Sequence, residues 1–223
     1  MTYSPRFVFI TALFVTVLVA SNIMAVKLID VAGLVLPAAI ILFPIAYILG
    51  DVLTEVYGYR QTRRVIWMGF ACNLLAVAAI WLGGLLPAAG FWEGGDAWAT
   101  TLGQTPRILG ASFLAYLIGE FANAYVLAKI KIATGGKWLW LRTISSTVVG
   151  QGLDSTVFIT LAFAGTLPAS AIISIIVGQW LVKSAYEAAA TPLTYAVVGY
   201  LKRAEGIDTY DTEISFNPLK VND

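Results

Sequence analysis

Six apolar runs dominate this sequence, and each is long enough to cross a lipid bilayer. A membrane-spanning helix needs about 20 mostly apolar residues, and short polar links separate the runs. Of the 223 residues, 59% are hydrophobic and only 12% are charged, whereas soluble domains average about 25% charged residues. We therefore predict an all-α integral membrane protein, a single-domain bundle of six transmembrane helices. The predicted spans are residues 7–26, 34–56, 65–86, 107–128, 143–163 and 169–200.

Two of these spans have individual features. Pro44 lies inside the second span and removes a backbone hydrogen bond, so we expect that helix to be interrupted there. The sixth span is the longest, because its apolar character continues past Pro192. A signal peptide is an alternative interpretation of the first run, but the run is long enough to span the membrane.

Lysine and arginine are concentrated in two links that would lie on the same side of the membrane. Positive residues collect on the cytoplasmic side, so both chain termini are predicted to be cytoplasmic. The expected location is the cell membrane, which is the inner membrane in a Gram-negative organism. We expect the polar residues 202–223 to form a solvated cytoplasmic tail. The basic residues of the two links are Arg60, Arg63 and Arg64, and Lys129, Lys131, Lys137 and Arg142.

The composition excludes several classes of function. A net charge of +1 gives no argument for nucleic-acid binding. The absence of histidine excludes a Ser-His-Asp triad. With Cys72 as the single cysteine, an internal disulfide and a Cys/His metal site are also excluded. We expect no metal and no cofactor.

The second span carries carboxylates in an otherwise apolar setting. Asp51 and Glu55 are four residues apart, which places them on one face of a helix. A charge at membrane depth is costly and normally faces a partner or a polar cavity. We therefore expect this helix to line a polar interior, as in a transporter or an intramembrane enzyme.

Carboxylates in the predicted spans outnumber the one internal base, Lys183. Glu120 and Asp154 are about nine or more residues from the nearest flanking base, so they should lie near the middle of the membrane. Protonation, Lys183 or a ligand must offset the surplus of acids, and such a cavity suits a substrate with hydrogen-bond donors or positive charge. The five carboxylates are Asp51, Glu55, Glu120, Asp154 and Glu187.

A structural role is the alternative for several polar residues. Lys183 lies one turn from Glu187 and could pair with it, and Asp51 and Glu55 precede the basic residues that begin at Arg60. Amide side chains can bind substrate or join helices by hydrogen bonds. The amides within the spans are Asn73, Asn123, Gln151 and Gln179.

An enzyme is the more distant alternative. Gly50-Asp51 and Gly152-Leu153-Asp154 match fragments of intramembrane aspartyl proteases, whose two aspartates share a proton. Only these fragments match. A transporter needs an energy source, and the chain has no nucleotide-binding Gly-x-x-x-x-Gly-Lys-Ser/Thr loop. An ion gradient, a separate ATPase subunit and passive facilitation are the remaining options.

Ordered motifs run along nearly the whole chain. They include Ser21-Asn22 with Lys27, Phe43-Pro44-x-x-Tyr47, Gly50-Asp51-Val-Leu-Thr-Glu55-Val-Tyr57-Gly58-Tyr59, Gly119-Glu120-Phe-x-Asn123, Gly150-Gln151-x-x-Asp154-Ser155, Lys183-x-x-x-Glu187 and Thr191-Pro192-x-x-Tyr195. In these motifs the chain resembles the queuosine-precursor transporter family, also called the vitamin uptake transporter family.

This resemblance implies import of 7-deazaguanine precursors of queuosine, a modified tRNA nucleoside, namely the 7-cyano and 7-aminomethyl compounds. The chain itself is not an enzyme and binds no nucleic acid in this interpretation; its partners are the deazapurine and the lipid bilayer. A homodimer is left open. So is the alternative of a substrate-binding membrane subunit that works with a separate ATPase on another vitamin-like solute.

The site follows from the resemblance and from the chemistry of a guanine-like base, which has N–H donors, an O6 acceptor and a flat face. We expect Glu120 or Asp154 to accept hydrogen bonds from the N–H edge of the base. Lys183 would donate to O6 or, alternatively, balance charge. The remaining polar edge is assigned to Asn123 and Gln151, and stacking to Tyr47 and Phe43. The candidates for coupling or gating are Asp51, Glu55, Glu187, Asn22 and Lys27.

Overall fold

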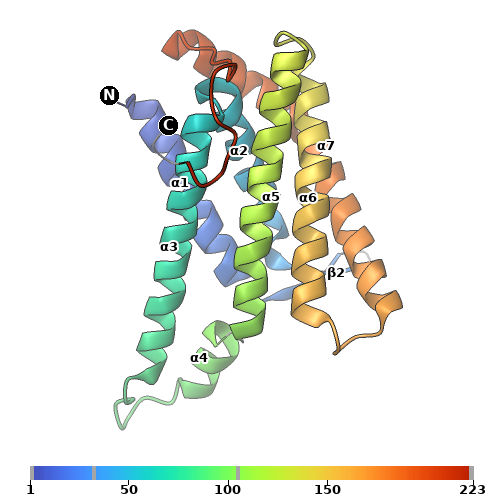
Figure 1. Cartoon of the computed structure of the whole chain (residues 1–223). Helices are drawn as coiled ribbons and strands as arrows, with labels where there is room; N and C mark the ends of the chain where they lie inside the picture. The colour runs from blue at the N-terminus through green and yellow to red at the C-terminus, as the bar shows by residue number, and fades with distance from the viewer. Residues whose placement is uncertain (1–2, 32–33, 104–105, 221–223) are drawn as a thin grey trace.

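The protein is a bundle of long helices whose chain begins and ends at the same end of the bundle (Figure 1). The computed structural model describes residues 3–31, 34–103 and 106–220. Ser4 Oγ donates a 3.0 Å hydrogen bond to Glu205 Oε1, which ties the start of the first helix to the end of the last. The predicted all-α membrane bundle is confirmed. The long helices in the described residues are α1 (Pro5–Met24), α2 (Phe43–Tyr57), α3 (Tyr59–Leu85), α5 (Pro106–Ala133), α6 (Leu139–Phe163) and α7 (Ala169–Glu205).

The second predicted span is wrong at its amino-terminal end. Residues that we expected to begin a helix at 34 instead form strand β2 (Leu34–Pro37), which pairs antiparallel with β1 (Leu28–Val31). A short apolar run rich in Leu and Val fits a strand as well as a helix, so its composition could not separate the two. A 3₁₀ helix, η1 (Ala38–Ile41), follows, and then α2 begins.

The interruption expected at Pro44 is present, at the junction between η1 and α2. Pro44 lies in the first turn of α2, where the missing backbone N–H costs no helical hydrogen bond. The long last helix is also confirmed: α7 has 37 residues and contains Pro192 in its interior. A further short helix, α4 (Gly95–Leu102), lies in the link between α3 and α5, where we had predicted no span.

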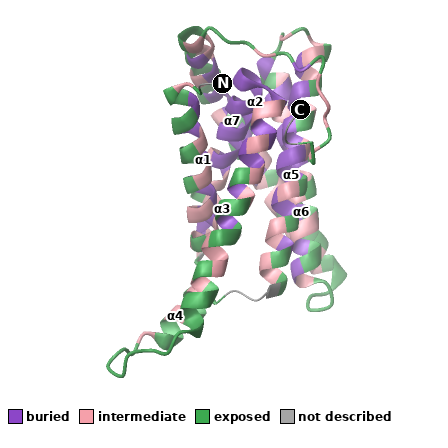
Figure 2. Ribbon diagram, turned by 60° about the vertical axis from the view of Figure 1, so that its left-hand side comes forward, coloured by how far each residue is buried: buried purple, intermediate pink, exposed green. Residues whose placement is uncertain are grey.

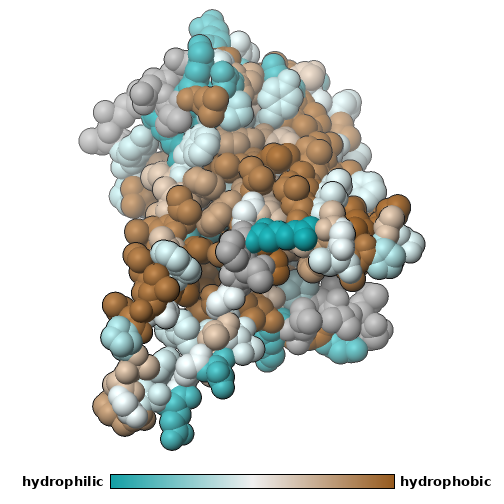
Figure 3. Space-filling view, turned by 60° about the horizontal axis from the view of Figure 1, so that its bottom comes forward, coloured by the Kyte–Doolittle hydropathy of each residue, from teal (hydrophilic) through white to brown (hydrophobic). Residues whose placement is uncertain are grey.

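The surface of the bundle suits a bilayer. Figure 3 shows apolar side chains over the flank of the bundle and hydrophilic ones gathered towards its ends. Within the described residues, five segments are long and apolar enough to cross a membrane by length and composition: Pro5–Met24, Ala38–Tyr57, Tyr59–Leu85, Gly95–Ala133 and Ala169–Glu205. Helix α6 has 25 residues but is not among these five segments, because the hydroxyl and amide groups on its buried side make it less apolar.

Glycines allow α5 and α6 to pack closely along their length (Figure 1). A Cβ atom at Gly119 would lie 3.1 Å from the Gly150 carbonyl oxygen and 2.9 Å from Asp154 Cβ. A Cβ atom at Gly150 would lie 2.8 Å from Asn123 Cβ. Small residues at a helix contact in a membrane let the two backbones approach. This contact fixes the depth at which the polar residues of α5 and α6 face the bundle interior.

The carboxy-terminal segment was predicted to be a solvated tail from residue 202, but its first residues belong to α7 and several of the later ones dock on the bundle. Helix α7 continues to Glu205, and the chain after Gly206 packs against α3. Arg63 Nη1 donates to the carbonyl oxygens of Ser215 and Asn217, both at 2.8 Å, and Trp67 Nε1 donates to the Pro218 carbonyl oxygen at 2.9 Å.

An aspartate in this segment also joins the fold. Asp211 accepts a 2.8 Å hydrogen bond from the Tyr59 amide. Burial raises the pKa of the Asp211 carboxyl above its ordinary value, although the amide hydrogen bond opposes this effect. The segment is therefore a docked part of the structure, because it satisfies polar groups that α3 would otherwise bury without partners.

Buried residues are concentrated in the half of the bundle that contains both ends of the described chain (Figure 2). There α2 lies between α1, α3, α5 and α7. Its residues from Ala46 to Tyr57 are all buried. Helix α2 is therefore the central element of the bundle, and its polar residues have to find partners inside the protein.

Candidate functional site

A cavity of about 480 Å³ opens in the half of the bundle away from the chain ends. Its wall comes from the end of α1, the segment around η1, the start of α2, the first half of α5, the end of α6 and the first half of α7. A volume of this size suits a small organic ligand. The wall is mostly apolar, and its polar residues are Asn22, Tyr47, Ser112, Tyr116, Glu120, Asp154, Gln179 and Lys183.

Three polar residues of α2 are spaced one helical turn apart and lie at three successive depths. Tyr47 borders the cavity, Asp51 lies one turn further on, and Glu55 lies one turn beyond Asp51. We call these the cavity level, the middle level and the end level. The shared helical face predicted for Asp51 and Glu55 is present, but the two residues have different surroundings.

The cavity level brings together the central part of the predicted site. Lys183 Nζ lies 2.8 Å from Asp154 Oδ2, so Lys183 pairs across α6 and α7 rather than with Glu187 on its own helix. The same ammonium group lies 5.1 Å from the centre of the Phe43 ring. A cation at this distance from an aromatic face is attracted to it. Phe43, Asp154 and Lys183 therefore form one contiguous wall.

Glu120 is buried in the same wall and takes part in no ion pair among the described residues. Its Oε2 atom lies against the backbone of α2, 3.2 Å from the position that a Cβ atom would take at Gly50. Glycine at position 50 therefore makes room for this carboxylate. Tyr47 lies nearby, with its hydroxyl 3.1 Å from the Cβ position at Gly119. The cavity thus presents two carboxylates, one ammonium group and several aromatic rings, among them Phe43 and Tyr47.

The middle level lies outside the cavity lining. Asn123 Nδ2 donates a 2.7 Å hydrogen bond to Asp51 Oδ1, and both residues are buried. Glu187 of α7 is also buried, and its carboxylate interacts electrostatically with that of Asp51. Asn123 and Gln151, which we expected to contact substrate, belong to this level because neither lines the cavity.

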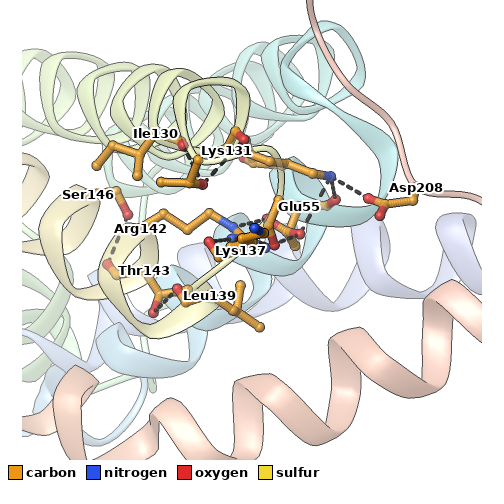
Figure 4. A network of polar contacts seen from close by, with 12 residues as sticks. Glu55, Ile130, Lys131, Lys137, Leu139, Arg142, Thr143, Ser146 and Asp208 are labelled. Carbon is orange, nitrogen blue, oxygen red and sulfur yellow. Dashed lines mark hydrogen bonds and ion pairs between the residues drawn. The ribbon is translucent and has the colours of Figure 1, made fainter.

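The end level is a network of ion pairs around Glu55 (Figure 4). Arg142 Nε and Nη2 donate to the two carboxylate oxygens of Glu55 at 2.6 and 2.7 Å, which is a bidentate pair. Lys202 Nζ donates to Glu55 Oε1 at 2.6 Å. Lys131 Nζ lies 3.5 Å from the same oxygen and donates to the Glu55 carbonyl oxygen at 2.6 Å. Glu55 is thus held by residues of α5, α6 and α7.

Asp208 adds a second carboxylate to this network. Lys131 and Lys202 lie 2.6 and 2.8 Å from its Oδ1 atom. Partial burial raises the pKa of the Asp208 carboxyl, but the hydrogen bonds from the two lysines outweigh this effect and hold that pKa below its ordinary value. The basic residues around Arg60 that we proposed as neighbours of Glu55 are not its ion-pair partners among the described residues.

Asn22 and Lys27, the two candidates near the amino terminus, lie in different surroundings. Asn22 lines the cavity, and Ser112 Oγ donates to its Oδ1 at 3.4 Å. Lys27 follows α1 with an exposed side chain and is not among the lining residues. Sequence reasoning missed Ser112 and Tyr116. Both lie on the α5 face of Glu120, at four-residue intervals, so this spacing was a signal that could have identified them.

Comparison with known proteins matches residues 37–197 to the family described as "Putative vitamin uptake transporter". This range holds all three levels of α2 and the cavity-level residues of α5, α6 and α7. The chain belongs to the vitamin uptake transporter family. Because this is a family of transporters, membership confirms that the chain is a transporter and not an enzyme, and it removes the aspartyl protease alternative.

Two relatives of this family member are named as queuosine precursor transporters. A protein of Bacillus subtilis, "Probable queuosine precursor transporter", is 32% identical over 181 residues, which cover 80% of this chain and 78% of the relative. "Queuosine precursor transporter" of Escherichia coli is 29% identical over 121 residues, 54% of this chain and 52% of that protein. No solved structure matches the chain.

The end-level network predicts a large stability effect for a single isosteric substitution. Glu55→Gln keeps the side-chain shape but leaves Arg142, Lys131 and Lys202 near one another with Asp208 as their remaining carboxylate. Removing one partner of a buried ion pair costs about 3–5 kcal/mol, so we expect a clear fall in the thermal unfolding temperature of the purified protein.

Glu93→Gln is the control for this substitution, because Glu93 is exposed in the link between α3 and α4. It should unfold at the wild-type temperature. Equal unfolding temperatures for Glu55→Gln and Glu93→Gln would show that the network does not hold the helices together.

Proposed function

We propose that this chain imports 7-deazaguanine precursors of queuosine, the 7-cyano and 7-aminomethyl compounds, through the cavity level. The observation that carries this proposal is the pairing of an acidic, aromatic cavity of about 480 Å³ with two relatives named as queuosine precursor transporters. The names supply the class of solute, and the cavity supplies groups that suit its chemistry.

A deazaguanine ring has complementary groups for each part of this wall. Its ring N–H and exocyclic amino group can donate two parallel hydrogen bonds to one carboxylate. Of the two carboxylates that line the cavity, Asp154 is paired with Lys183 and Glu120 has no ion pair among the described residues. Its O6 atom accepts hydrogen bonds, which the Lys183 ammonium can donate. Its flat face can stack on Phe43 or Tyr47. Asp154 orients Lys183 and balances its charge.

The net charge of the cavity level also bears on the choice of substrate. Glu120 and Asp154 carry two negative charges when ionised, and Lys183 carries one positive charge. A neutral 7-cyano compound leaves this imbalance in place, whereas the 7-aminomethyl compound brings a positive charge into a site of low dielectric. Under the proposal, the 7-aminomethyl compound is the tighter ligand.

We also propose an orientation with both termini in the cytoplasm. The start of α3, with Arg60 to Arg64, and the α5–α6 connection with its flanking turns, from Lys129 to Arg142, lie at the end of the bundle where the described chain begins and ends. Such concentration of basic residues marks the cytoplasmic side. The cavity belongs to the other half of the bundle and then faces the outside, which is the side from which an importer receives its substrate.

Ligand binding tests the proposed site. Thermal-shift titrations of purified protein should show stabilisation by both deazaguanines, with guanine as the comparison ligand. Glu120→Gln removes a charged acceptor of two hydrogen bonds, worth about 1.5–3 kcal/mol, so affinity should fall about 10- to 100-fold. Asp154→Asn should also weaken binding, because Lys183 would lose the carboxylate that orients it. Glu93→Gln, which is remote from the cavity, should bind like wild type.

Two outcomes would contradict this assignment. If no deazaguanine stabilises the folded wild-type protein, deazaguanines are not its substrates. Wild-type affinity in the Glu120→Gln variant would remove Glu120 from the site.

Cysteine labelling tests the orientation. In a Cys72→Ala background, Gly90→Cys lies in the link before α4 and Lys137→Cys in the link between α5 and α6, and both positions are exposed. A membrane-impermeant maleimide should label Gly90→Cys in intact spheroplasts but label Lys137→Cys only after lysis. The reverse pattern would place the termini and the basic links outside the cell.

A further inference from the structure

Asp51 of α2 and Glu187 of α7 form a buried pair of carboxylates that the proposed substrate site does not use. Asp51 is 0% exposed and Glu187 is 1% exposed. The two interact electrostatically across the contact between α2 and α7. In the described structure, Asp51 Oδ2 and both carboxylate oxygens of Glu187 have no hydrogen-bond partner. Such orphaned oxygens are rare in a protein interior and need an explanation.

Neighbouring side chains at this level supply further acceptors. Asn123 uses its amide N–H on Asp51, which leaves its Oδ1 atom without a partner. Gln151 follows Gly150, whose Cβ position touches Asn123, and its Oε1 atom is also without a partner among the described residues. A donor hydrogen is therefore what this group of oxygens lacks.

The cations of the cavity level and the end level already have carboxylate partners. Lys183 is paired with Asp154 at the cavity level, and Arg142, Lys131 and Lys202 are paired with Glu55 or Asp208 at the end level. Helix α1 contributes Arg6, which pairs with Glu205, and α3 contributes Arg63, which holds the carboxy-terminal segment. Among the described residues, the titratable groups that interact with the pair are Tyr47 and Glu55 of α2 and Glu120 of α5.

Asp51 Oδ1 accepts one hydrogen bond from Asn123, but neither carboxylate forms an ion pair among the described residues. Two interacting anions of this kind cannot both remain ionised in a medium of low dielectric, because both are poorly solvated and each repels the other. One proton resolves this conflict. It turns one carboxyl group into a donor that the other carboxylate, or the Asn123 or Gln151 amide oxygen, can accept. Among the described residues, no group of three or more Asp, Glu, Cys or His side chains could hold a metal ion.

We propose that Asp51 and Glu187 form a proton-binding site that couples movement of substrate through the cavity to a proton gradient. The coupling rests on the proposed transport function, whereas the proton site rests on the buried carboxylates alone. With the proton bound, α2 and α7 can stay in contact; with both groups ionised, repulsion drives them apart.

The position of the pair explains how the cavity would influence it. Asp51 follows Tyr47 by one turn of α2, and Glu187 follows Lys183 by one turn of α7. Tyr47 and Lys183 both line the cavity. A ligand that shifts either helix at the cavity level therefore changes the distance between the two carboxylates, and with it the proton affinity of the pair. By linkage, the proton then changes the affinity of the cavity for its ligand by the same factor.

Infrared spectroscopy tests the proton site without any substrate. Purified wild-type protein in lipid nanodiscs should show, at neutral pH, a C=O stretching band of a protonated carboxyl group. Both Asp51→Asn and Glu187→Gln should remove the part of that band that the pair contributes, and Glu93→Gln should keep the wild-type band. Both variants preserve shape, and if one fails to fold the other decides the question. A wild type without the band, or equal bands in both variants and wild type, would overturn the proposal.

Uptake into proteoliposomes that contain only this chain tests the coupling. A proton gradient directed with the substrate should accelerate uptake of the 7-aminomethyl compound by wild type. Asp51→Asn and Glu187→Gln should lose this acceleration and give the same rate with and without the gradient. Wild-type uptake that ignores the gradient would overturn the coupling and leave the proposed function in place. No uptake or binding at all would overturn the proposed function, and the infrared result would still decide the proton site.

Discussion

The free-energy cost of keeping a carboxylate away from water governs how this bundle is built around α2. Helix α2 is buried along most of its length, and its acids cannot reach solvent. Glu55 is offset by Arg142 and two lysines, which join α5, α6 and α7 at one end of the bundle. At the cavity level Lys183 offsets Asp154. The ion pairs that satisfy buried charge thereby also fix the helix contacts that form the cavity.

Much of this arrangement follows from the sequence. The length and apolar character of the runs predict the long helices, and helical spacing places Asp51 and Glu55 on one face. Glu120 and Asp154 were identified as interior residues because no flanking base was near enough to explain their charge, and Lys183 because it is the one base inside the predicted spans. The structure brings these three to one cavity wall together with Tyr47 and Phe43.

Other features depend on contacts that a linear pattern does not contain. The β1–β2 hairpin replaces the predicted start of the second span because an apolar run of this length fits either conformation. The carboxy-terminal segment looked solvated because its partner, Arg63, is distant in sequence. Lys183 pairs with Asp154, since the antiparallel packing of α6 and α7 brings them closer than the neighbouring turn brings Glu187. Asn123 lies outside the cavity lining because α5 packs on α2, where Asn123 donates to Asp51.

The most direct test of the central claim is a structure of the protein in lipid nanodiscs with 7-aminomethyl-7-deazaguanine bound. The account predicts density for the ligand in the cavity, with its ring against Phe43 or Tyr47 and its N–H edge on the Glu120 carboxylate. Density for the ligand elsewhere in the bundle, with the Glu120 carboxylate uninvolved, would contradict the assignment of this cavity as the substrate site.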